Sequence, residues 1–349
     1  MSRYLVTGAT GFLGTHLVAH LRDKGHDVVA LVRGDAEDLA DRGVVIAKGD
    51  VLDPHAVNAA AAGCDGVFHC AGKVSRKPED AEELHRTNVE GTKIVVSASK
   101  AAGVRRLVLA STSGTVAISK EPKVRDERAK TPIDLIAKWP YYRSKLYAEQ
   151  AALEASSEGF AVVSVNPSLL LGPGDLRGSS TGDVRSFLEG EVPVIPAGGM
   201  SFVDARDVAP ALLAAMERGK PGARYLVSGA NMSMSAFFGR LSRISGVELP
   251  AMRAPKGLTL AKIGASLFDH AKKVLPVKGE LDSVSAEMGQ VFWYCDSRKA
   301  TEELGFAPRD PNETLADTIA DLYERGVVWP VAPRKSLALT GDARATSGE

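Results

Sequence analysis

The first half of the chain alternates short apolar runs, rich in β-branched residues, with segments in which apolar residues recur every three to four positions. The apolar runs predict strands and the periodic segments predict helices. The expected strands are residues 4–6, 28–32, 44–46, 66–69, 107–109 and 161–165. The expected helices are one that ends at Gly25, one opened by Asp53-Pro54, and residues 81–102 and 141–155. Because the strands are apolar throughout, we expect an α/β fold, a doubly wound parallel sheet covered on both faces.

The pattern loosens after Pro167, where residues 172–201 are rich in Gly, Ser and Pro and predict only one short helix, around 184–188. Beyond them, a strand at 202–204, a helix at 205–218 and a strand at 225–227 predict a return to the sheet. Helical patterns follow at residues 234–245, 258–273, 298–304 and 312–325.

These patterns divide the chain into two expected domains. The first covers residues 1–171 together with 202–228, and a smaller C-terminal α/β domain covers 172–201 and 229–330. The tail, 331–349, has no periodicity and is expected to be mobile.

Composition narrows the class of protein. The 349 residues include 43 basic and 43 acidic side chains, so the net charge is zero and a general nucleic-acid surface is not expected. The three cysteines, Cys64, Cys70 and Cys295, are too few for a disulfide framework and fit a reducing compartment. No signal-like segment precedes the first strand, and charges interrupt the apolar stretch 258–277, so we expect a cytoplasmic protein without a membrane span.

The turn between the first strand and the first helix is rich in glycine. It reads Thr7-Gly8-Ala9-Thr10-Gly11-Phe12-Leu13-Gly14. Gly8 permits a tight turn, Gly11 allows the backbone to approach a pyrophosphate, and Gly14 allows the helix to pack against the strand. The free N–H groups at the helix N-terminus favour phosphate. At the first βα turn, this motif predicts a Rossmann-type dinucleotide-binding domain.

The end of the second strand bears on the choice of dinucleotide. An NAD enzyme usually has an acidic residue there, for the ribose 2′-hydroxyl, whereas this strand ends in Arg33. A guanidinium suits a 2′-phosphate, which favours NADP over NAD. Asp50 and Val51 are expected to border the adenine, and Ala71-Gly72 to let the cofactor pass close to the backbone.

A tyrosine and a lysine lie four residues apart at the start of the 141–155 helix, and therefore on one face. They are Tyr141 and Lys145. A free phenol has a pKa near 10, and a neighbouring ammonium lowers it toward a working range for acid–base catalysis. The fifth strand runs into the hydroxyl cluster Ser111-Thr112-Ser113, at the end of the sheet where ligands bind.

Five segments, in order, resemble the extended short-chain dehydrogenase/reductases. They are TGATGFLG, ASTSGTV, PYYRSK, VNPSLLLGPGD and SFVDARDVA. The resemblance covers roughly residues 3–325. Within that family, the sequence is similar to the dihydroflavonol reductase-like branch, which also includes cinnamoyl-CoA reductases and bacterial proteins labelled sugar epimerases.

The resemblance implies roles for individual residues. Tyr141 is the implied acid–base, and Lys145 the residue that binds the nicotinamide ribose and lowers the tyrosine pKa. The catalytic hydroxyl is Thr112 or Ser113, with Thr112 favoured. The implied cofactor-binding residues are Gly8, Thr10, Gly11, Phe12, Leu13, Arg33, Asp50, Val51, Ala71, Gly72, Asn88, Tyr141, Lys145, Pro167 and Ser168. For Asn88, a structural role and a water-linked contact toward Lys145 or the fifth strand both stay open.

Other polar residues have simpler interpretations. His16 and His20 lack the adjacent Glu of the zinc motif and lie off the apolar stripe of the first helix, so we expect a solvated face and no metal site. Asp204 and Asp207 are expected to cap a helix rather than to act as acids. Cys70 is expected to be a small apolar filler.

The sequence predicts an NADP(H)-dependent carbonyl reductase or alcohol dehydrogenase with a small-molecule substrate. One alternative is a nucleotide-sugar epimerase or dehydratase with bound NAD, for which Arg177 and Arg185 are candidate diphosphate ligands. The other is a non-catalytic NADP-binding sensor. Lys73-Val74-Ser75, Leu169-Leu170-Leu171 and Trp139 suggest a mostly apolar pocket for an aromatic, steroid-like or acyl carbonyl. A homodimer, common in the superfamily, stays open.

Overall fold

The computed structural model describes residues 1–255 and 283–329. Its main feature is a parallel sheet of seven strands in the order β10-β6-β5-β4-β1-β2-β3, which confirms the predicted doubly wound α/β fold. The strands are β1 (Arg3–Thr7), β2 (Asp27–Val32), β3 (Val45–Lys48), β4 (Gly66–His69), β5 (Arg106–Ala110), β6 (Ala161–Pro167) and β10 (Arg224–Val227). The strand order reverses between β1 and β4, and a ligand crevice forms at such a switch point, outside the carboxyl ends of the strands.

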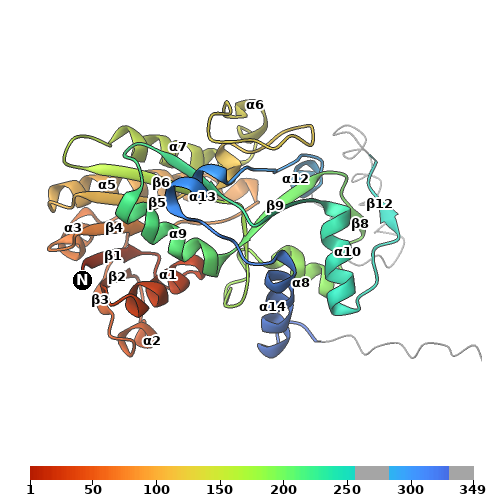
Figure 1. The fold of residues 1–349 in the computed structure, drawn as a ribbon, viewed down its shortest axis with the longest axis horizontal. Helices are drawn as coiled ribbons and strands as arrows, with labels where there is room; N and C mark the ends of the chain where they lie inside the picture. The colour runs from red at the N-terminus through yellow and green to blue at the C-terminus, as the bar shows by residue number, and fades with distance from the viewer. Residues whose placement is uncertain (256–282, 330–349) are drawn as a thin grey trace, which may run out of the picture.

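Helices cover both faces of this sheet (Figure 1). One face packs an apolar core against α1 (Phe12–Asp23), α9 (Ala205–Arg218) and α13 (Arg298–Leu304). The other packs a second core against α3 (Pro54–Ala61), α5 (Gly91–Ala101) and α7 (Pro140–Glu154). Both cores form because side chains of successive strand residues point alternately to opposite faces of the sheet. The short helix α2 (Glu37–Ala40) follows β2.

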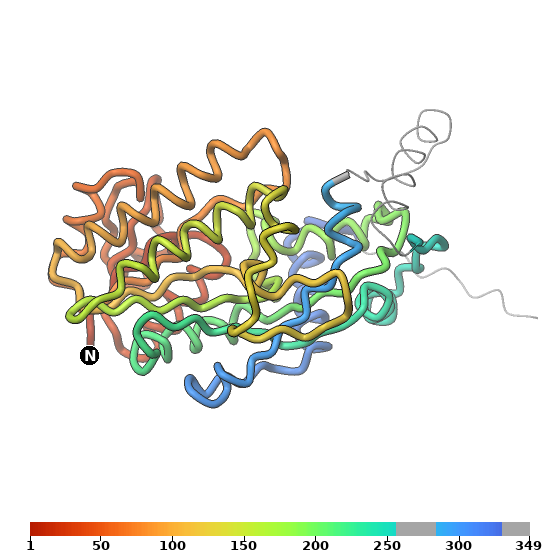
Figure 2. Tube along the Cα trace, turned by 90° about the horizontal axis from the view of Figure 1, so that it is seen from above, coloured from red at the N-terminus to blue at the C-terminus, as the bar shows by residue number. Residues whose placement is uncertain are grey.

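A second lobe is built around a three-stranded sheet in the order β11-β9-β7. Its strands are β7 (Leu169–Leu171), β9 (Gly199–Asp204) and β11 (Ala230–Ser233), and its helices are α8 (Gly182–Leu188), α10 (Met234–Ser245) and α14 (Pro311–Glu324). The short pair β8 (Val194–Ile195) and β12 (Met252–Arg253) lies beside α10 (Figure 1). Figure 2 shows this lobe extending from one end of the main sheet.

One prediction about the sheets is wrong. Residues 202–204 do not return to the main sheet, because β9 pairs in parallel with β7 and antiparallel with β11. The physical reason is that the chain leaves the main sheet at Ser168, and β10 occupies the edge beside β6. The small sheet therefore begins at β7, two residues before the predicted boundary at 171, whereas α9 and β10 do pack on the main sheet.

The predicted helix 81–102 is interrupted. It consists of α4 (Ala81–Leu84), a π-helical turn η2 (His85–Glu90) and α5. A π-turn adds one residue per turn and is common at functional sites. Here it contains Asn88, which lies buried.

The remaining short elements connect these layers. They are η1 (Pro78–Asp80), η3 (Ser113–Thr115), α6 (Ile133–Ile136) and α12 (Ser283–Met288). The predicted helix 258–273 and the tail 331–349 lie outside the described residues. Among the described helices, none combines the length and the apolar character needed to cross a bilayer.

Candidate active site

The glycine-rich turn lies at the switch point of the main sheet. Gly8 follows β1 with φ of 73°, a backbone conformation that favours glycine. A Cβ atom on Gly8 would come within 2.6 Å of the Ala71 nitrogen, just after β4, and one on Gly14 within 2.0 Å of the Gly8 oxygen. The turn is therefore packed as tightly as the roles assigned to Gly8 and Gly14 require.

The first turn of α1 presents its backbone amides without a side-chain cap. Gly11 is the N-cap residue, no side chain of the described residues caps the amides of the turn, and the turn contains no acidic residue. Uncapped amides at a helix start are donors for an anion such as a pyrophosphate. Thr10 is exposed beside them, whereas Phe12 and Leu13 are buried. The site thus fits the phosphates of a dinucleotide.

Arg33 lies at the tip of β2 with a largely exposed side chain, 75% accessible. Its guanidinium is 4.0 Å from Asp50, which also accepts a hydrogen bond from the Leu52 amide at 2.9 Å. Val51 packs against the core on this face of the sheet, and a Cβ atom on Gly91, at the start of α5, would come within 3.1 Å of its side chain. The structure therefore brings Arg33 and Asp50 to one edge of the sheet and leaves the guanidinium available to a ligand.

Tyr141 and Lys145 begin α7 and lie on one face, as their spacing predicts. The ammonium of buried Lys145 donates to the Ala110 carbonyl, at the end of β5, at 2.8 Å. Burial lowers the pKa of Lys145 to about 8, although the charge of Glu149 opposes this. The Tyr141 hydroxyl makes no hydrogen bond to any described residue.

The expected lowering of the tyrosine pKa is not found. Burial, with a smaller contribution from Tyr142, raises the pKa of Tyr141 above its ordinary value. The reason is that the Lys145 ammonium is bonded to a backbone carbonyl, and no hydrogen bond joins it to the phenol. In this state Tyr141 is a protonated donor.

The two candidate hydroxyls differ in their surroundings. Thr112 is half-buried and caps η3, accepting from the Gly114 amide at 3.3 Å. Ser113 is buried, and its hydroxyl makes no hydrogen bond to another described residue. Both directly follow the strand whose end holds Lys145, so the choice between them stays open.

Asn88 is fully engaged with protein groups. Its amide donates to the Lys73 carbonyl at 3.0 Å and to the Ser144 hydroxyl at 2.9 Å, and accepts from the Lys73 amide at 2.8 Å. Ser144 in turn donates to the Tyr141 carbonyl at 2.7 Å. Asn88 thus ties the segment after β4 to the start of α7, next to Tyr141 and Lys145.

His69 belongs to the same polar layer, and the sequence analysis did not single it out. It lies buried between Thr7, 2.7 Å from Nδ1, and Thr92, 3.0 Å from Nε2. Because Thr92 donates to the Asn88 carbonyl, the network assigns the proton of His69 to Nε2. Burial lowers the pKa of His69 to about 3, so the ring is neutral. The sequence signal that could have identified His69 is a polar residue at the end of the apolar strand β4.

Pro167 ends β6 and Ser168 follows it, with its amide donating to the Val227 carbonyl at 3.0 Å. The Ser168 hydroxyl is buried without a hydrogen-bond partner among the described residues. Such a group is rare in proteins and is commonly satisfied by a ligand or water. It lies at the carboxyl end of the sheet, and a contact of Ser168 with the cofactor stays a prediction.

An aromatic cluster adjoins Tyr141. The Tyr142 ring lies 5.0 Å from that of Tyr141 and 4.9 Å from that of Trp293, and Trp139 stacks on Trp293 at 5.6 Å. A Cβ atom on Gly114 would come within 2.3 Å of the Tyr142 ring, so this glycine admits the cluster. Trp293 was not predicted, because its segment lies more than 140 residues from the α7 start.

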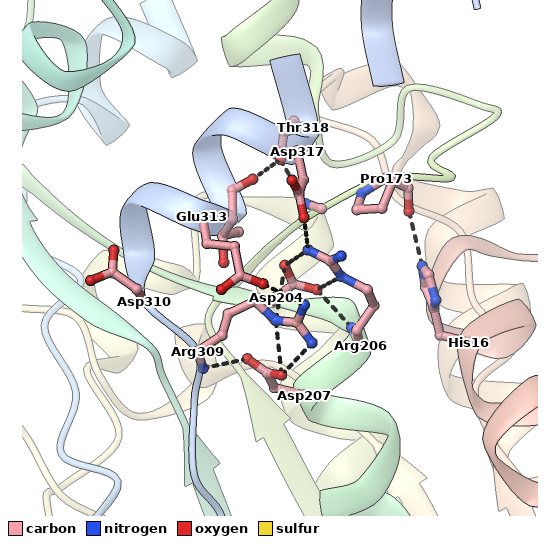
Figure 3. Close-up of polar contacts among 12 residues, drawn as sticks. His16, Pro173, Asp204, Arg206, Asp207, Arg309, Asp310, Glu313, Asp317 and Thr318 are labelled. Atoms are coloured by element: carbon pink, nitrogen blue, oxygen red, sulfur yellow. Dashed lines mark hydrogen bonds and ion pairs between the residues drawn. The ribbon is translucent and has the colours of Figure 1, made fainter. Parts of the chain in front are cut away.

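Two polar predictions have different outcomes (Figure 3). Asp204 caps α9 through the Arg206 amide at 2.9 Å, as expected. The solvated face predicted for His16 is wrong, because its Nε2 contacts the Pro173 carbonyl at 2.9 Å and burial lowers its pKa. Residues after β7 cover this helix, a contact that helical periodicity does not reveal. Cys70 packs against the core, as predicted, and burial raises its pKa to about 12.

Comparison with known proteins shows the family of the chain. A family model described as the NAD dependent epimerase/dehydratase family matches residues 4–228, which contain the glycine turn, the Tyr141 helix and β10. A Synechocystis protein named "Putative dihydroflavonol 4-reductase" is 33% identical over 335 residues, covering 93% of this chain and 96% of its own. Tetraketide alpha-pyrone reductase 1 of Arabidopsis thaliana is 34% identical over 350 residues, covering 94% and 97%.

One similar solved structure contains a bound nicotinamide cofactor. MoeE5 in complex with UDP-glucose and NAD has a TM-score of 0.71 and 26% identity, with coverage of 93% of this chain and 99% of its own. These findings, with the uncapped turn and the free Ser168 hydroxyl, support a nicotinamide cofactor in the crevice. The chain is an enzyme that belongs to the NAD dependent epimerase/dehydratase family, among the extended short-chain dehydrogenase/reductases.

Proposed function

We propose that the enzyme is an NADP(H)-dependent carbonyl reductase or alcohol dehydrogenase. The observation that carries the proposal is the Tyr141 hydroxyl. It has no hydrogen-bond partner among the described residues, and it shares a helix face with Lys145, which is held at the end of β5 beside Thr112. This arrangement offers a proton to a substrate oxygen.

The protein groups have distinct parts in the reaction. When bound, a nicotinamide supplies hydride to the carbonyl carbon or accepts it from the alcohol carbon. Tyr141 donates its proton to the carbonyl oxygen as negative charge develops there, and takes it back in the reverse direction. The Thr112 or Ser113 hydroxyl orients that oxygen by a hydrogen bond. The Lys145 ammonium stabilises the phenolate left on Tyr141.

Arg33 supports NADP over NAD. Arg33 rather than a carboxylate stands at the tip of β2, and within the described part of the chain its exposed guanidinium lies no nearer to an acidic group than 4.0 Å, at Asp50. An Arg in this position pairs bidentately with a 2′-phosphate. Lys48 is paired with Asp35 at 2.7 Å, which leaves Arg33 as the cation proposed for this contact.

The cluster of Trp139, Tyr142 and Trp293 supports a substrate with an apolar, planar carbonyl. Aromatic rings bind flat apolar groups through offset or edge contacts. Two relatives carry names of reductases, for a dihydroflavonol and for a tetraketide pyrone. We therefore propose an aromatic ketone or aldehyde rather than a polar sugar.

A nucleotide-sugar epimerase is the second candidate. The family model and the UDP-glucose complex of MoeE5 favour it. The diphosphate ligands suggested from the sequence lend it less support. Arg185 is exposed and paired with Glu189 at 2.9 Å, and Arg177 lies on an exposed loop.

The test uses the purified enzyme in two ways. One sample is denatured to release and identify any bound nucleotide. The native enzyme is assayed for NADPH and NADH consumption with a panel of aromatic ketones and aldehydes. The proposal predicts net oxidation of NADPH by at least one carbonyl. Tightly bound NAD without net consumption, together with interconversion of a UDP-sugar, would establish the epimerase instead. Tight NADPH binding with no turnover on either panel would indicate the sensor.

A further inference from the structure

Glu149 is a fully buried carboxylate, 0% exposed, on the face of α7 that carries the catalytic pair. It lies four residues after Lys145 and eight after Tyr141. A buried carboxylate is costly unless several donors meet it. The spacing alone did not single out Glu149, because most helical glutamates at such positions are solvated.

Three donors from two strand ends converge on one oxygen of Glu149. Ser111 and Thr115, on the two sides of Thr112, both donate to Oε2, Thr115 at 3.0 Å. The Asn166 amide donates to the same oxygen at 2.5 Å and to the Thr112 carbonyl at 3.1 Å. The carboxylate therefore holds the loop after β5 on both sides of Thr112 and through its backbone.

The other oxygen of Glu149 faces Arg224 at the start of β10, 2.9 Å away. The Arg224 side chain is 22% exposed, so its positive charge lies between the solvent and the buried carboxylate. Removing one partner of such a pair leaves an uncompensated charge. The pair joins α7 to the strand that closes the main sheet.

We propose that Glu149 is a positioning residue that sets the Thr112 loop against the Tyr141–Lys145 face of α7. This inference rests on the proposed hydride-transfer function. Orienting interactions of this kind affect turnover strongly, because a misplacement of about 1 Å in the reacting groups costs roughly 100-fold in rate.

The charge of Glu149 also acts on Lys145. Glu149 raises the pKa of Lys145 against the lowering by burial, and the other titratable groups that face this ammonium are Cys70 and His69, at the end of β4. Loss of the carboxylate therefore lets Lys145 lose its proton at lower pH. The alkaline limb of the kcat profile should move to lower pH in its absence.

The experiment compares Glu149→Gln with Arg106→Gln. In E149Q, one carboxylate oxygen becomes an NH2 group, which faces either Arg224 or Asn166, both donors. We expect kcat to fall by about 10- to 100-fold with the NADPH Kd little changed, and the alkaline limb to shift to lower pH. Arg106 is the matched control, since it bonds the Ala215 and Gly219 carbonyls at the other end of β5. R106Q should lose stability and keep both kcat and its pH profile.

Hydrogen exchange gives a second readout that does not depend on turnover. Amides of residues 111–116 should exchange faster in E149Q than in the wild type, and R106Q should leave them unchanged. If E149Q does not fold, Ser111→Ala removes a single donor and should show the same loosening with a smaller fall in kcat. Wild-type kcat together with wild-type exchange at 111–116 would overturn the positioning role. A wild-type enzyme without carbonyl turnover would refute the hydride-transfer function. The exchange data would still show whether Glu149 orders the loop at residues 111–116.

Discussion

The seven-stranded half and the smaller lobe use buried polar groups differently. Under the active site, His69, Thr92, Asn88 and Ser144 form a chain of hydrogen bonds between neutral groups. Where the lobes meet, the buried polar contacts are ion pairs. Asp204 binds Arg206 at 2.7 Å and lies 3.5 Å from Arg309 (Figure 3).

The junction joins chain segments that are far apart in sequence. Arg206 also reaches Asp317 on α14 at 2.7 Å, and Arg309 bonds Asp207 at 2.8 Å. Burial raises the pKa of Asp204, but hydrogen bonds from Arg206 and the charges of Arg206 and Arg309 together outweigh this effect, so the pKa lies below its usual value. The comparison indicates that neutral hydrogen bonds join the segment after β4 to the start of α7, with the buried pair Glu149–Arg224 beside them, whereas several ion pairs join the two lobes.

The sharpest test of this division is Tyr141→Phe. The change removes one hydroxyl that has no hydrogen-bond partner among the described residues, so it should leave stability and NADPH binding nearly intact. We expect kcat to fall by about 1,000-fold, because the proton donor is lost. Steady-state assays and fluorescence titration measure the two effects, and near-normal turnover would refute the role of Tyr141.

The junction is tested by Asp204→Asn. Asparagine keeps the helix cap but removes the fully buried charge that Arg206 and Arg309 share, so we expect a loss of about 3 kcal/mol in the free energy of unfolding. Urea denaturation measures it.

The matched control is Asp296→Asn, which breaks a pair of the same spacing with Arg298, whose side chain is 79% exposed. It should cost under about 0.5 kcal/mol. Equal losses in the two variants would remove the distinction between the buried junction and a surface pair.

The cofactor preference is tested by Arg33→Ser. Loss of one exposed guanidinium should raise the NADPH Kd about tenfold, equivalent to about 1.4 kcal/mol, and leave the NADH Kd unchanged. Parallel fluorescence titrations decide it. If both constants stay at their wild-type values, Arg33 does not contact a 2′-phosphate.

The smallest expected effect is in the pH dependence. Because burial lowers the pKa of Lys145 to about 8, the ammonium is present below that pH and lost above it. Reduction needs the ammonium, so kcat should be about half-maximal near pH 8 and decline further at higher pH. A kcat that stays constant to pH 10 would show that Lys145 keeps its proton in the complex.

Most of the fold could be predicted from local features of the sequence. The β4 bounds, the turn at Gly8 and the α7 pair followed from apolar runs, a glycine spacing and a four-residue spacing, which are properties of a few adjacent residues. Helix 81–102 was predicted without its π-turn, because apolar periodicity does not distinguish one extra residue in a turn.

The order of the βα units, the dinucleotide turn and the shared face of Tyr141 and Lys145 were determined by the sequence itself, since each depends on neighbouring residues. Tertiary structure alone decided that β9 joins the small sheet, that His16 is covered, and that Glu149 meets Ser111 and Arg224. These contacts join residues 33 to 157 positions apart in the sequence, and their energies depend on burial and on partners that a linear pattern does not contain.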